Sequence, residues 1–413
     1  MDPPGAACCY PSPRVRVVLY TGKGGVGKTT TAAATAACAA ARGRRALVVS
    51  ADPAHSLGDV FGERLGPSPR RVAASAARGR PLRLDACEID ARAEMERHWG
   101  AVRDWLVAIF RHQGIEGAVA EELALLPGAE EVAALLAVEA HARSGAYDLV
   151  VVDCAPTGAT LRLLALPELA RSAFRVALRL QQAVAAVVTP LARGLLAAPL
   201  PEAAVFRDAD ALFYRRLRAL RRLVTGPATS VRLVVTPERM VIDEALRAHT
   251  DLALFEVPCD AVVVNRVLPD DAAREAFFRD WSRIQAERLA EVEAAFAPLP
   301  VLRAPLRDDE VIGLAALARH GAELFGRRDP TARLQCGSRL RFRHDAEGLR
   351  LELPLPHAEA GALHVAKRHD ELWIAAGSLR RSLRLPRALA RASLATAQLA
   401  AGTLVVRFEP GGA

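Results

Sequence analysis

Short apolar runs, rich in valine and leucine, recur through the first three quarters of the chain. Within each run the apolar residues are consecutive instead of alternating with polar ones, which indicates strands buried on both faces of a parallel sheet. The segments between the runs are rich in Ala, Leu, Arg and Glu and have a helical composition. Strands that alternate with helices predict an α/β fold with an open, mostly parallel sheet. The predicted strands are VRVVLY (15–20), RALVVSA (45–51), LRLDACEID (82–90), YDLVVVD (147–153), SVRLVVTP (230–237), DAVVVNRV (260–267) and LPVLRAP (299–305).

Two of the segments between strands are too long for single crossover helices. They span about 91–146 and 161–229, and we expect their helices to form an inserted helical subdomain at the carboxyl ends of the strands. The second segment is strongly apolar. It is either an internal helical core or a groove that holds a hydrophobic helix from another protein. The groove would be lined by Phe174, Leu178, Val184, Val187 and Leu195.

The pattern changes to a period of two after the segment GRRDPTARL (326–334). In LRLELPLP, the side chains of Leu349, Leu351, Leu353 and Leu355 point to one side and the residues between them point to the other. The strand patterns LHVAKRHDELWIAAG and TLVVRFE follow, separated by turn residues. The tail is therefore predicted to be a small antiparallel β-sandwich.

The sequence GKGGVGKT (22–29) lies between the first predicted strand and a predicted helix, which is the setting of a phosphate-binding P-loop. Its glycines let backbone amides converge on phosphate oxygens, and the start of the helix adds partial positive charge. Lys28 is expected to bridge the β- and γ-phosphates of ATP, and the Thr29 hydroxyl to bind Mg²⁺. The predicted contact residues are Gly22, Lys23, Gly24, Gly25, Val26, Gly27, Lys28, Thr29 and Thr30.

Two aspartates lie where predicted strands end, at the same edge of the sheet. Asp153 ends the run LVVVD, and a carboxylate there would hold Mg²⁺ through a water molecule. The segment that follows, DCAPTGATLR, is rich in small and polar residues that could change shape with the γ-phosphate. Asp52, in SADPAHSLGD, either orients the attacking water or caps a helix.

Composition and charge restrict the class of protein. A chain of 413 residues with 51% hydrophobic and 25% charged residues is typical of a soluble protein with one large and one small domain. The seven cysteines are scattered without a C-x-x-C pair, which favours a reducing compartment. We find no signal peptide or membrane-spanning stretch, so a cytoplasmic location is expected. The net charge of +8 includes no basic cluster interleaved with aromatics, so nucleic-acid binding is not expected.

The lysines are distributed unevenly. Only three of the 55 Lys and Arg residues are lysines, and two of those three, Lys23 and Lys28, lie in the same loop. Because a P-loop needs one lysine for its own phosphates, Lys23 requires a separate explanation.

The motifs together resemble a known family. The loop KGGVGKTT is similar to the deviant Walker A motif of a class that includes partitioning, division-site and nitrogenase iron-protein ATPases. DPAHSLGDVFG and DCAPTGATLR, with VVTPE, VVVNRVLP and PLRDDEVIG, narrow the resemblance to the family of arsenite-pump ATPases and tail-anchored-protein targeting factors, over about residues 14–326. The tail, about 336–409, resembles the small heat-shock (α-crystallin) domain at the C-terminus of one bacterial and plastid branch of this family.

The resemblance implies roles for several residues. Lys23 would be the signature lysine, which reaches across a homodimer interface to the partner's phosphates as an arginine finger does. Asp52 would polarise the attacking water, the segment from Asp153 would be a nucleotide-sensing switch, and Asn265 and the loop at Pro305 would contact adenine. The implied parts of the chain are a flexible N-terminus (1–13), an ATPase domain (14–326), a linker (327–335) and the β-sandwich (336–413).

The chain also departs from the family pattern. The C-x-x-C that shares a zinc ion at the dimer interface of eukaryotic targeting factors is replaced by RDWSRIQAERL, so no zinc is expected. The second ATPase half of arsenite pumps has no counterpart, and no thiolate triad for a trivalent metalloid is evident. Position 159 is Ala where the switch often has His.

These observations predict a cytoplasmic, homodimeric, Mg²⁺-dependent ATPase, located in the plastid stroma if the source is a photosynthetic eukaryote. The nucleotide would control binding of a hydrophobic helical segment of a client protein, in membrane-protein targeting or as a holdase chaperone, with a membrane receptor as a further partner. The alternative is an ATPase subunit that drives arsenite or antimonite efflux. A partitioning-type ATPase is disfavoured by the long helical insertions.

Overall fold

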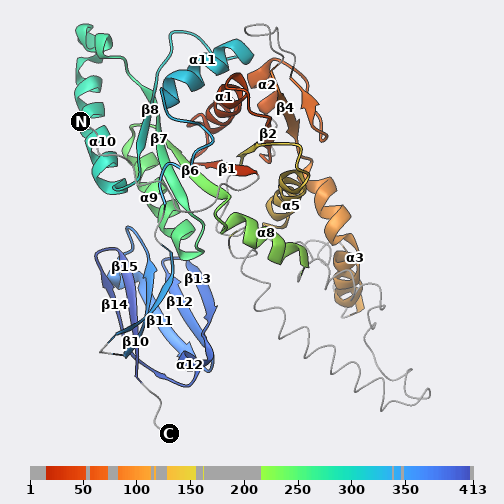
Figure 1. The fold of residues 1–413 in the computed structure, drawn as a ribbon, viewed down its shortest axis with the longest axis vertical. Helices are drawn as coiled ribbons and strands as arrows, with labels where there is room; N and C mark the ends of the chain where they lie inside the picture. Colours follow the sequence, from red (N-terminus) through yellow and green to blue (C-terminus); the bar gives the residue numbers. More distant parts are fainter. Residues whose placement is uncertain are drawn as a thin grey trace. The chain divides into compact units, whose positions relative to one another are not determined.

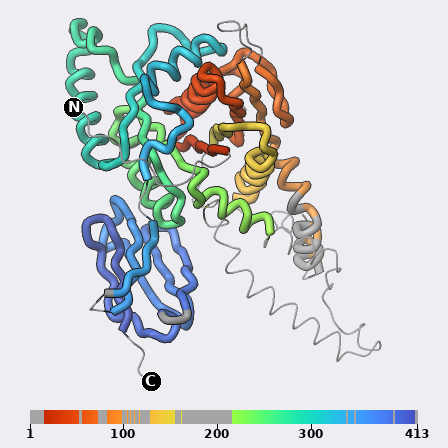
Figure 2. The backbone as a smooth tube through the Cα atoms, viewed as in Figure 1, coloured from red at the N-terminus to blue at the C-terminus, as the bar shows by residue number. Residues whose placement is uncertain are grey.

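The computed structural model describes residues 15–52, 56–72, 82–112, 116–117, 128–154, 161, 215–336, 339–345 and 348–409. The chain divides into two compact units (Figure 1; Figure 2). The first unit contains Met1–Ile89, Ala140–Ala155 and Leu223–Ala413, and the second contains Asp90–Glu139 and Pro156–Arg222.

The first unit is built on an eight-stranded sheet with the order β3-β4-β2-β5-β1-β6-β7-β8. All neighbouring strands are parallel except β3 and β4, which are antiparallel. Strands β1, β2, β5 and β6 are buried at every position, which explains their apolar runs without alternation. The predicted parallel sheet is therefore confirmed. The strands are β1 (Arg16–Thr21), β2 (Ala46–Ser50), β3 (Arg70–Arg71), β4 (Leu84–Glu88), β5 (Leu149–Asp153), β6 (Thr229–Val235), β7 (Cys259–Val267) and β8 (Val301–Pro305).

Helices cover both sides of this sheet (Figure 1). Helix α1 (Lys28–Ala41) connects β1 to β2, whereas α9 (Arg239–Leu254) and α10 (Ala276–Phe296) connect β6 to β7 and β7 to β8. Because right-handed crossovers that run toward opposite edges of a sheet place their helices on opposite sides, α1 lies on one side and α9 and α10 on the other. Helix α11 (Leu314–Phe325) follows β8 and packs against α1. The short helices of this part are α2 (Leu57–Phe61) and η4 (Asp270–Arg274).

The close packing of α11 on α1 depends on small residues. The buried positions of α1 are mostly alanine, and Gly321 is buried on α11. A Cβ atom at Gly321 would lie 2.3 Å from the carbonyl oxygen of Ala34 and 2.8 Å from the Cβ of Cys38. Glycine at this position therefore allows the two helices to approach this closely.

The second unit is helical in its described part. It contains α3 (Ala91–His112) and most of α5 (Ala129–Arg143) and α8 (Leu217–Val224), in agreement with the predicted helical insertion. A small buried cluster joins Met95 of α3 to Ala129 and Ala133 of α5. Ala159 and all the residues predicted to line a groove lie outside the described residues; the groove residues are Phe174, Leu178, Val184, Val187 and Leu195.

The C-terminal part of the first unit is an antiparallel β-sandwich made of a four-stranded and a three-stranded sheet, as the sequence predicts. Leu351, Leu353 and Leu355 are fully buried, which agrees with the period of two in this segment. The short helices are η5 (Ala360–Ala362) and α12 (Arg387–Ala390). The strands are β9 (Arg341–Asp345), β10 (Gly348–Pro354), β11 (Leu363–Arg368), β12 (Glu371–Ala376), β13 (Leu379–Arg384), β14 (Ser393–Ala400) and β15 (Thr403–Glu409).

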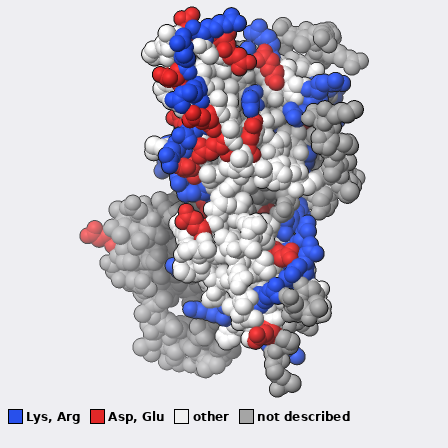
Figure 3. Space-filling view, turned by 90° about the vertical axis from the view of Figure 1, so that its left-hand side faces the viewer, with Lys and Arg blue, Asp and Glu red and all other residues white. Residues whose placement is uncertain are grey.

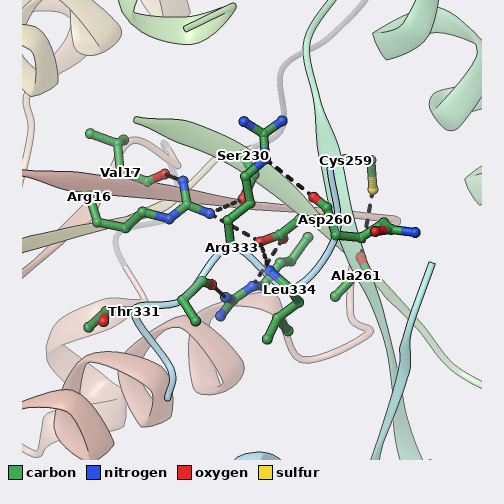
Figure 4. A network of polar contacts seen from close by, with 12 residues as sticks. Arg16, Val17, Ser230, Cys259, Asp260, Ala261, Thr331, Arg333 and Leu334 are labelled. Carbon is green, nitrogen blue, oxygen red and sulfur yellow. Dashed lines mark hydrogen bonds and ion pairs between the residues drawn. The ribbon is translucent and has the colours of Figure 1, made fainter. Parts of the chain in front are cut away.

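A buried cluster of charges joins three neighbouring strands of the sheet, β1, β6 and β7 (Figure 4). Asp260 of β7 has an exposed fraction of 0% and forms ion pairs with Arg16 of β1 at 3.0 Å and Arg232 of β6 at 3.3 Å. Arg16 also donates a hydrogen bond to the hydroxyl of Ser230. Burial lowers the pKa of Arg16 to about 10, so this guanidinium still carries its charge at neutral pH.

The chain between α11 and β9 is bonded to the same cluster. Arg232 donates hydrogen bonds to the carbonyl oxygens of Pro330 and Ala332, both at 3.1 Å. The backbone N–H of Leu334 donates to Asp260 at 3.1 Å. The segment that the sequence indicates as a linker is therefore attached to the sheet along this part of its length.

The sandwich contacts the C-terminal end of α9. Arg381 of β13 is 2% exposed, donates a hydrogen bond to the carbonyl oxygen of Leu254 and forms an ion pair with Glu256. The hydroxyl of Thr250 donates to the carbonyl oxygen of Pro356. Polar contacts, including a buried guanidinium, therefore join the two domains of this unit.

Two histidines lie at the same contact. Nδ1 of His249 is 3.1 Å from Nε2 of His357, and the ring of Phe296 packs against both, with centroid distances of 5.6 and 5.5 Å. Burial, and then the neighbouring His357, lowers the pKa of His249 to about 4, and burial lowers the pKa of His357. Both imidazoles are therefore neutral in the folded protein at pH 7.

Acidification should destabilise this contact. The pKa of His249 falls from 6.5 to about 4 on folding. Below pH 6.5 the unfolded chain therefore binds a proton at His249 that the folded protein does not bind, and the free energy of unfolding falls as the pH falls toward 4. Between pH 7 and pH 4.5, the unchanged protein should lose on the order of 2 kcal/mol more unfolding free energy than His249→Phe. Denaturant unfolding at both pH values measures this difference, with exposed His364→Phe as the control. Equal losses in the unchanged protein and in His249→Phe would contradict the prediction.

Candidate functional site

The loop between β1 and α1 has the backbone geometry of a P-loop. A Cβ atom at Gly22 would lie 2.2 Å from the carbonyl oxygen of Val234, and one at Gly27 would lie 2.2 Å from Nδ2 of Asn265. Gly27 also has a φ of 89°, in the left-handed region that favours glycine. Helix α1 begins at Lys28, so its first free backbone N–H groups lie at this loop, as anion binding requires.

The two lysines of the loop have different environments. The ammonium of Lys28 donates a hydrogen bond to the carbonyl oxygen of Lys23 at 3.1 Å, which holds it against its own loop. Lys23 contributes its backbone to this contact, not its side chain. Within the part of the chain that the structure describes, no hydrogen bond or ion pair involves the Lys23 ammonium.

The Thr29 hydroxyl and Asp153 form a polar pair beside the loop. The hydroxyl donates a hydrogen bond to Oδ2 of Asp153 at 2.6 Å and lies 3.2 Å from the Ser56 hydroxyl. Asp153 is fully buried, and its Oδ1 has no hydrogen-bond partner among the described residues. Burial raises the pKa of Asp153 to about 6. A buried carboxylate oxygen without a partner, next to a hydroxyl, fits the oxygen ligands that Mg²⁺ prefers.

Asp52 lies near Asp153 at the same edge of the sheet. Strands β2 and β5 pair so that Ser50 lies opposite Asp153, and Asp52 follows two residues later. The backbone N–H of Asp52 donates to the Ser50 hydroxyl at 3.3 Å. The charge of Asp52 contributes to the raised pKa of Asp153. The carboxylates predicted to hold the metal and to orient water are therefore close together.

A cavity of about 430 Å³ lies beside the P-loop. Its wall includes Gly27 and Thr30 of the loop and first helical turn, Asn265 of β7 and Pro305 at the end of β8. Nδ2 of Asn265 donates a hydrogen bond to the carbonyl oxygen of Val26 at 2.9 Å, which fixes the amide against the loop. The volume is in the usual range for small-molecule sites, about 300–1,000 Å³. The two residues predicted to contact adenine therefore share one cavity with the P-loop.

Two further residues of this site have no counterpart among the sequence predictions. Ser56 lies against Thr29, and His320 of α11 lies in the wall of the cavity. The sequence contains SADPAHSLGD as a motif, but nothing in it distinguishes the serine from the other polar residues. His320 comes from a helix far along the chain, so only the packing of α11 on α1 brings it here.

The described residues contain no group of three or more His, Cys, Asp or Glu side chains that could hold a metal ion. No described helix is both long enough and apolar enough to cross a membrane.

Comparison with known proteins identifies the family. Residues 15–326 match the anion-transporting ATPase family, and residues 346–408 match an HSP20-like domain found in its members. The chain is 32% identical over 383 residues to a protein of Aquifex aeolicus named as an arsenical pump-driving ATPase, covering 91% of this chain and 95% of the relative. It is 29% identical over 324 residues to the ATPase GET3 of Podospora anserina, covering 74% and 89%. The chain therefore belongs to the anion-transporting ATPase family and carries the HSP20-like C-terminal domain of that family.

Proposed function

We propose that this protein hydrolyses ATP with Mg²⁺ at the P-loop, acts as a homodimer, and uses the nucleotide to control binding of a hydrophobic segment of another protein. The observation that carries the proposal is the Thr29–Asp153 pair. Its unpartnered Oδ1 suits a metal ion beside the loop that would bind the β- and γ-phosphates. The apolar sequence between 161 and 229 supports the client part of the proposal.

Each residue of the site would have its own role in ATP hydrolysis. Bound Mg²⁺ would neutralise charge on the phosphate oxygens. Thr29 and Asp153, the latter through a water molecule, would hold the ion. Lys28 and the loop amides would bind the phosphates, and Asp52 would orient the water that attacks the γ-phosphate. The base would lie in the cavity along Asn265 and Pro305.

Replacing Asp153 by asparagine should separate metal binding from folding. The amide can still accept the hydrogen bond of Thr29, but it has no charge for Mg²⁺, so Mg²⁺-dependent hydrolysis should fall on the order of 100-fold. The unfolding free energy at pH 7 should not fall, because the raised pKa shows that burial disfavours the carboxylate. Turnover assays with varied Mg²⁺ and denaturant unfolding measure both effects. Hydrolysis as in the unchanged protein would contradict the assignment.

Three observations support a homodimer. The Lys23 ammonium is not used within its own described chain, as expected if it acts on a partner. On α10, Phe277, Trp281 and Ile284 are 75%, 57% and 36% exposed at spacings of four and three residues, so they form one apolar stripe. Basic and acidic side chains are interspersed on the upper part of the face in Figure 3, which suits a second copy of this chain better than nucleic acid.

Complementation between inactive variants tests the role of Lys23. Lys23→Ala should bind ATP normally but lose hydrolysis by about 10³-fold, as loss of an arginine finger does. Asp52→Asn should also be inactive. If Lys23 acts across the dimer, mixing the two variants creates sites with an intact Asp52 and a lysine from the partner, so activity returns. If mixed dimers form but remain inactive, Lys23 does not act in trans.

The client part is tested with Asp52→Asn, which should hold ATP without turnover. This variant should retain a tail-anchor helical peptide in a pull-down with ATP and release it with ADP. Aspartate in place of Val184, Val187 or Leu195 should abolish retention, because a charge in an apolar groove is costly. Ala93→Asp, at an exposed position of α3, is the matched control. Failure of Asp52→Asn to retain any hydrophobic peptide would contradict client binding.

The names of several relatives favour a second candidate, an ATPase that drives arsenite or antimonite efflux. Four of the five described cysteines give it little support. Cys38, Cys87, Cys154 and Cys259 are buried, and burial raises the pKa of both Cys87 and Cys259 to about 12. Soft metalloids bind thiolates, which such thiols do not supply at neutral pH. Stimulation of hydrolysis by arsenite that disappears on cysteine replacement would favour this candidate.

A further inference from the structure

His320 is a buried side chain whose hydrogen-bonding capacity is unused. It lies on α11 with an exposed fraction of 3%, and within the described part of the chain neither Nδ1 nor Nε2 has a hydrogen-bond partner. A buried imidazole without partners gives up its hydrogen bonds to water and gains none in return, so most such groups in folded proteins are paired. The fold therefore tolerates an unfavourable group at this position.

The position of His320 points to a ligand. The residue lines the 430 Å³ cavity together with Gly27, Asn265 and Pro305. The other buried polar group of this set, the Asn265 amide, is already bonded to the backbone of Val26. Of the side chains that line this cavity, His320 is the one with buried nitrogens that lack partners in the described chain.

The neighbours of His320 keep it neutral and in place. Burial, and then the charge of Arg307, lowers its pKa, while Glu323 acts in the opposite direction. Arg307 and Glu323 form an ion pair with each other, so neither needs the imidazole as a partner. The next residue, Gly321, lets α11 approach α1 closely, which brings His320 to the helix that begins at the P-loop. A neutral imidazole offers one donor and one acceptor.

We propose that His320 binds the base of the nucleotide through a ring nitrogen. The inference rests on the proposed nucleotide site, and it adds to Asn265 and Pro305 a side chain that makes a directed hydrogen bond. Adenine presents ring nitrogens that accept and an exocyclic amino group that donates, so either nitrogen of a neutral imidazole has a suitable partner. The base would thus supply a hydrogen-bond partner that the His320 imidazole lacks in the free protein.

Calorimetric titration with ATP and with inorganic tripolyphosphate tests the proposal, because only ATP has a base. His320→Phe keeps the ring and removes the nitrogens. It should weaken ATP binding about 10-fold, the effect of one lost hydrogen bond, and leave tripolyphosphate binding unchanged. The melting temperature without ligand should rise by about 2 °C or more, because the unpaired polar group is gone. His320→Asn places an amide near Nδ1 and His320→Gln places one near Nε2, so recovery in one of them identifies the nitrogen.

Three outcomes are distinguishable. ATP affinity in His320→Phe equal to that of the unchanged protein overturns the proposal. Equal weakening for ATP and tripolyphosphate also overturns it, because His320 would then act through the packing of α11 on the P-loop helix. Lys28→Ala is the control for the nucleotide site itself and should lose both ligands. If Lys28→Ala binds tripolyphosphate normally, the P-loop assignment fails, independently of the result for His320.

Discussion

The buried carboxylate of Asp260 is the constraint on which much of this structure depends. Two guanidinium groups, Arg16 and Arg232, are buried beside it, and neither could remain there without a negative partner. The three residues come from β1, β7 and β6, so their pairing connects these three neighbouring strands of the sheet. Removing a buried partner of this kind commonly costs about 3–5 kcal/mol, because the other charges then remain uncompensated.

Arg16 and Asp260 of this cluster lie at the amino ends of their strands, opposite to the nucleotide site, yet hydrogen bonds connect the cluster to that site. Arg232 donates to the Tyr20 hydroxyl at 3.2 Å, and Tyr20 lies 2.6 Å from the Thr35 hydroxyl. Thr35 donates to the carbonyl oxygen of Thr31, and the Thr31 hydroxyl donates to the carbonyl oxygen of Gly27, each at 2.8 Å. A series of hydrogen bonds between polar groups therefore connects the charge cluster to the P-loop at Gly27.

The sequence predicts this architecture well where local pattern and burial coincide. The runs that form β1, β5 and β6 are apolar because both faces of each strand are covered. Strand β3 has no such signal, because it consists of two exposed arginines and pairs only along one edge. A sequence pattern cannot show a strand that is defined by its hydrogen bonds alone.

In the candidate site, too, some residues are marked by a local sequence pattern and others are brought together only by the fold. The P-loop is predictable because one continuous motif contains its glycines, lysine and threonine, and Asp153 because it ends a buried strand. Asn265 and Pro305 depend on a family resemblance, since no local feature marks them as neighbours of the loop. His320 depends entirely on tertiary packing: a lone histidine on an apolar helical face gives no sign that its nitrogens lack partners.

The family match ends at residue 326, whereas the acceptors of Arg232 are at Pro330 and Ala332. The evolutionary boundary of the ATPase domain thus falls short of its physical boundary, and a chain ending at 326 would retain a buried guanidinium without these two carbonyl acceptors.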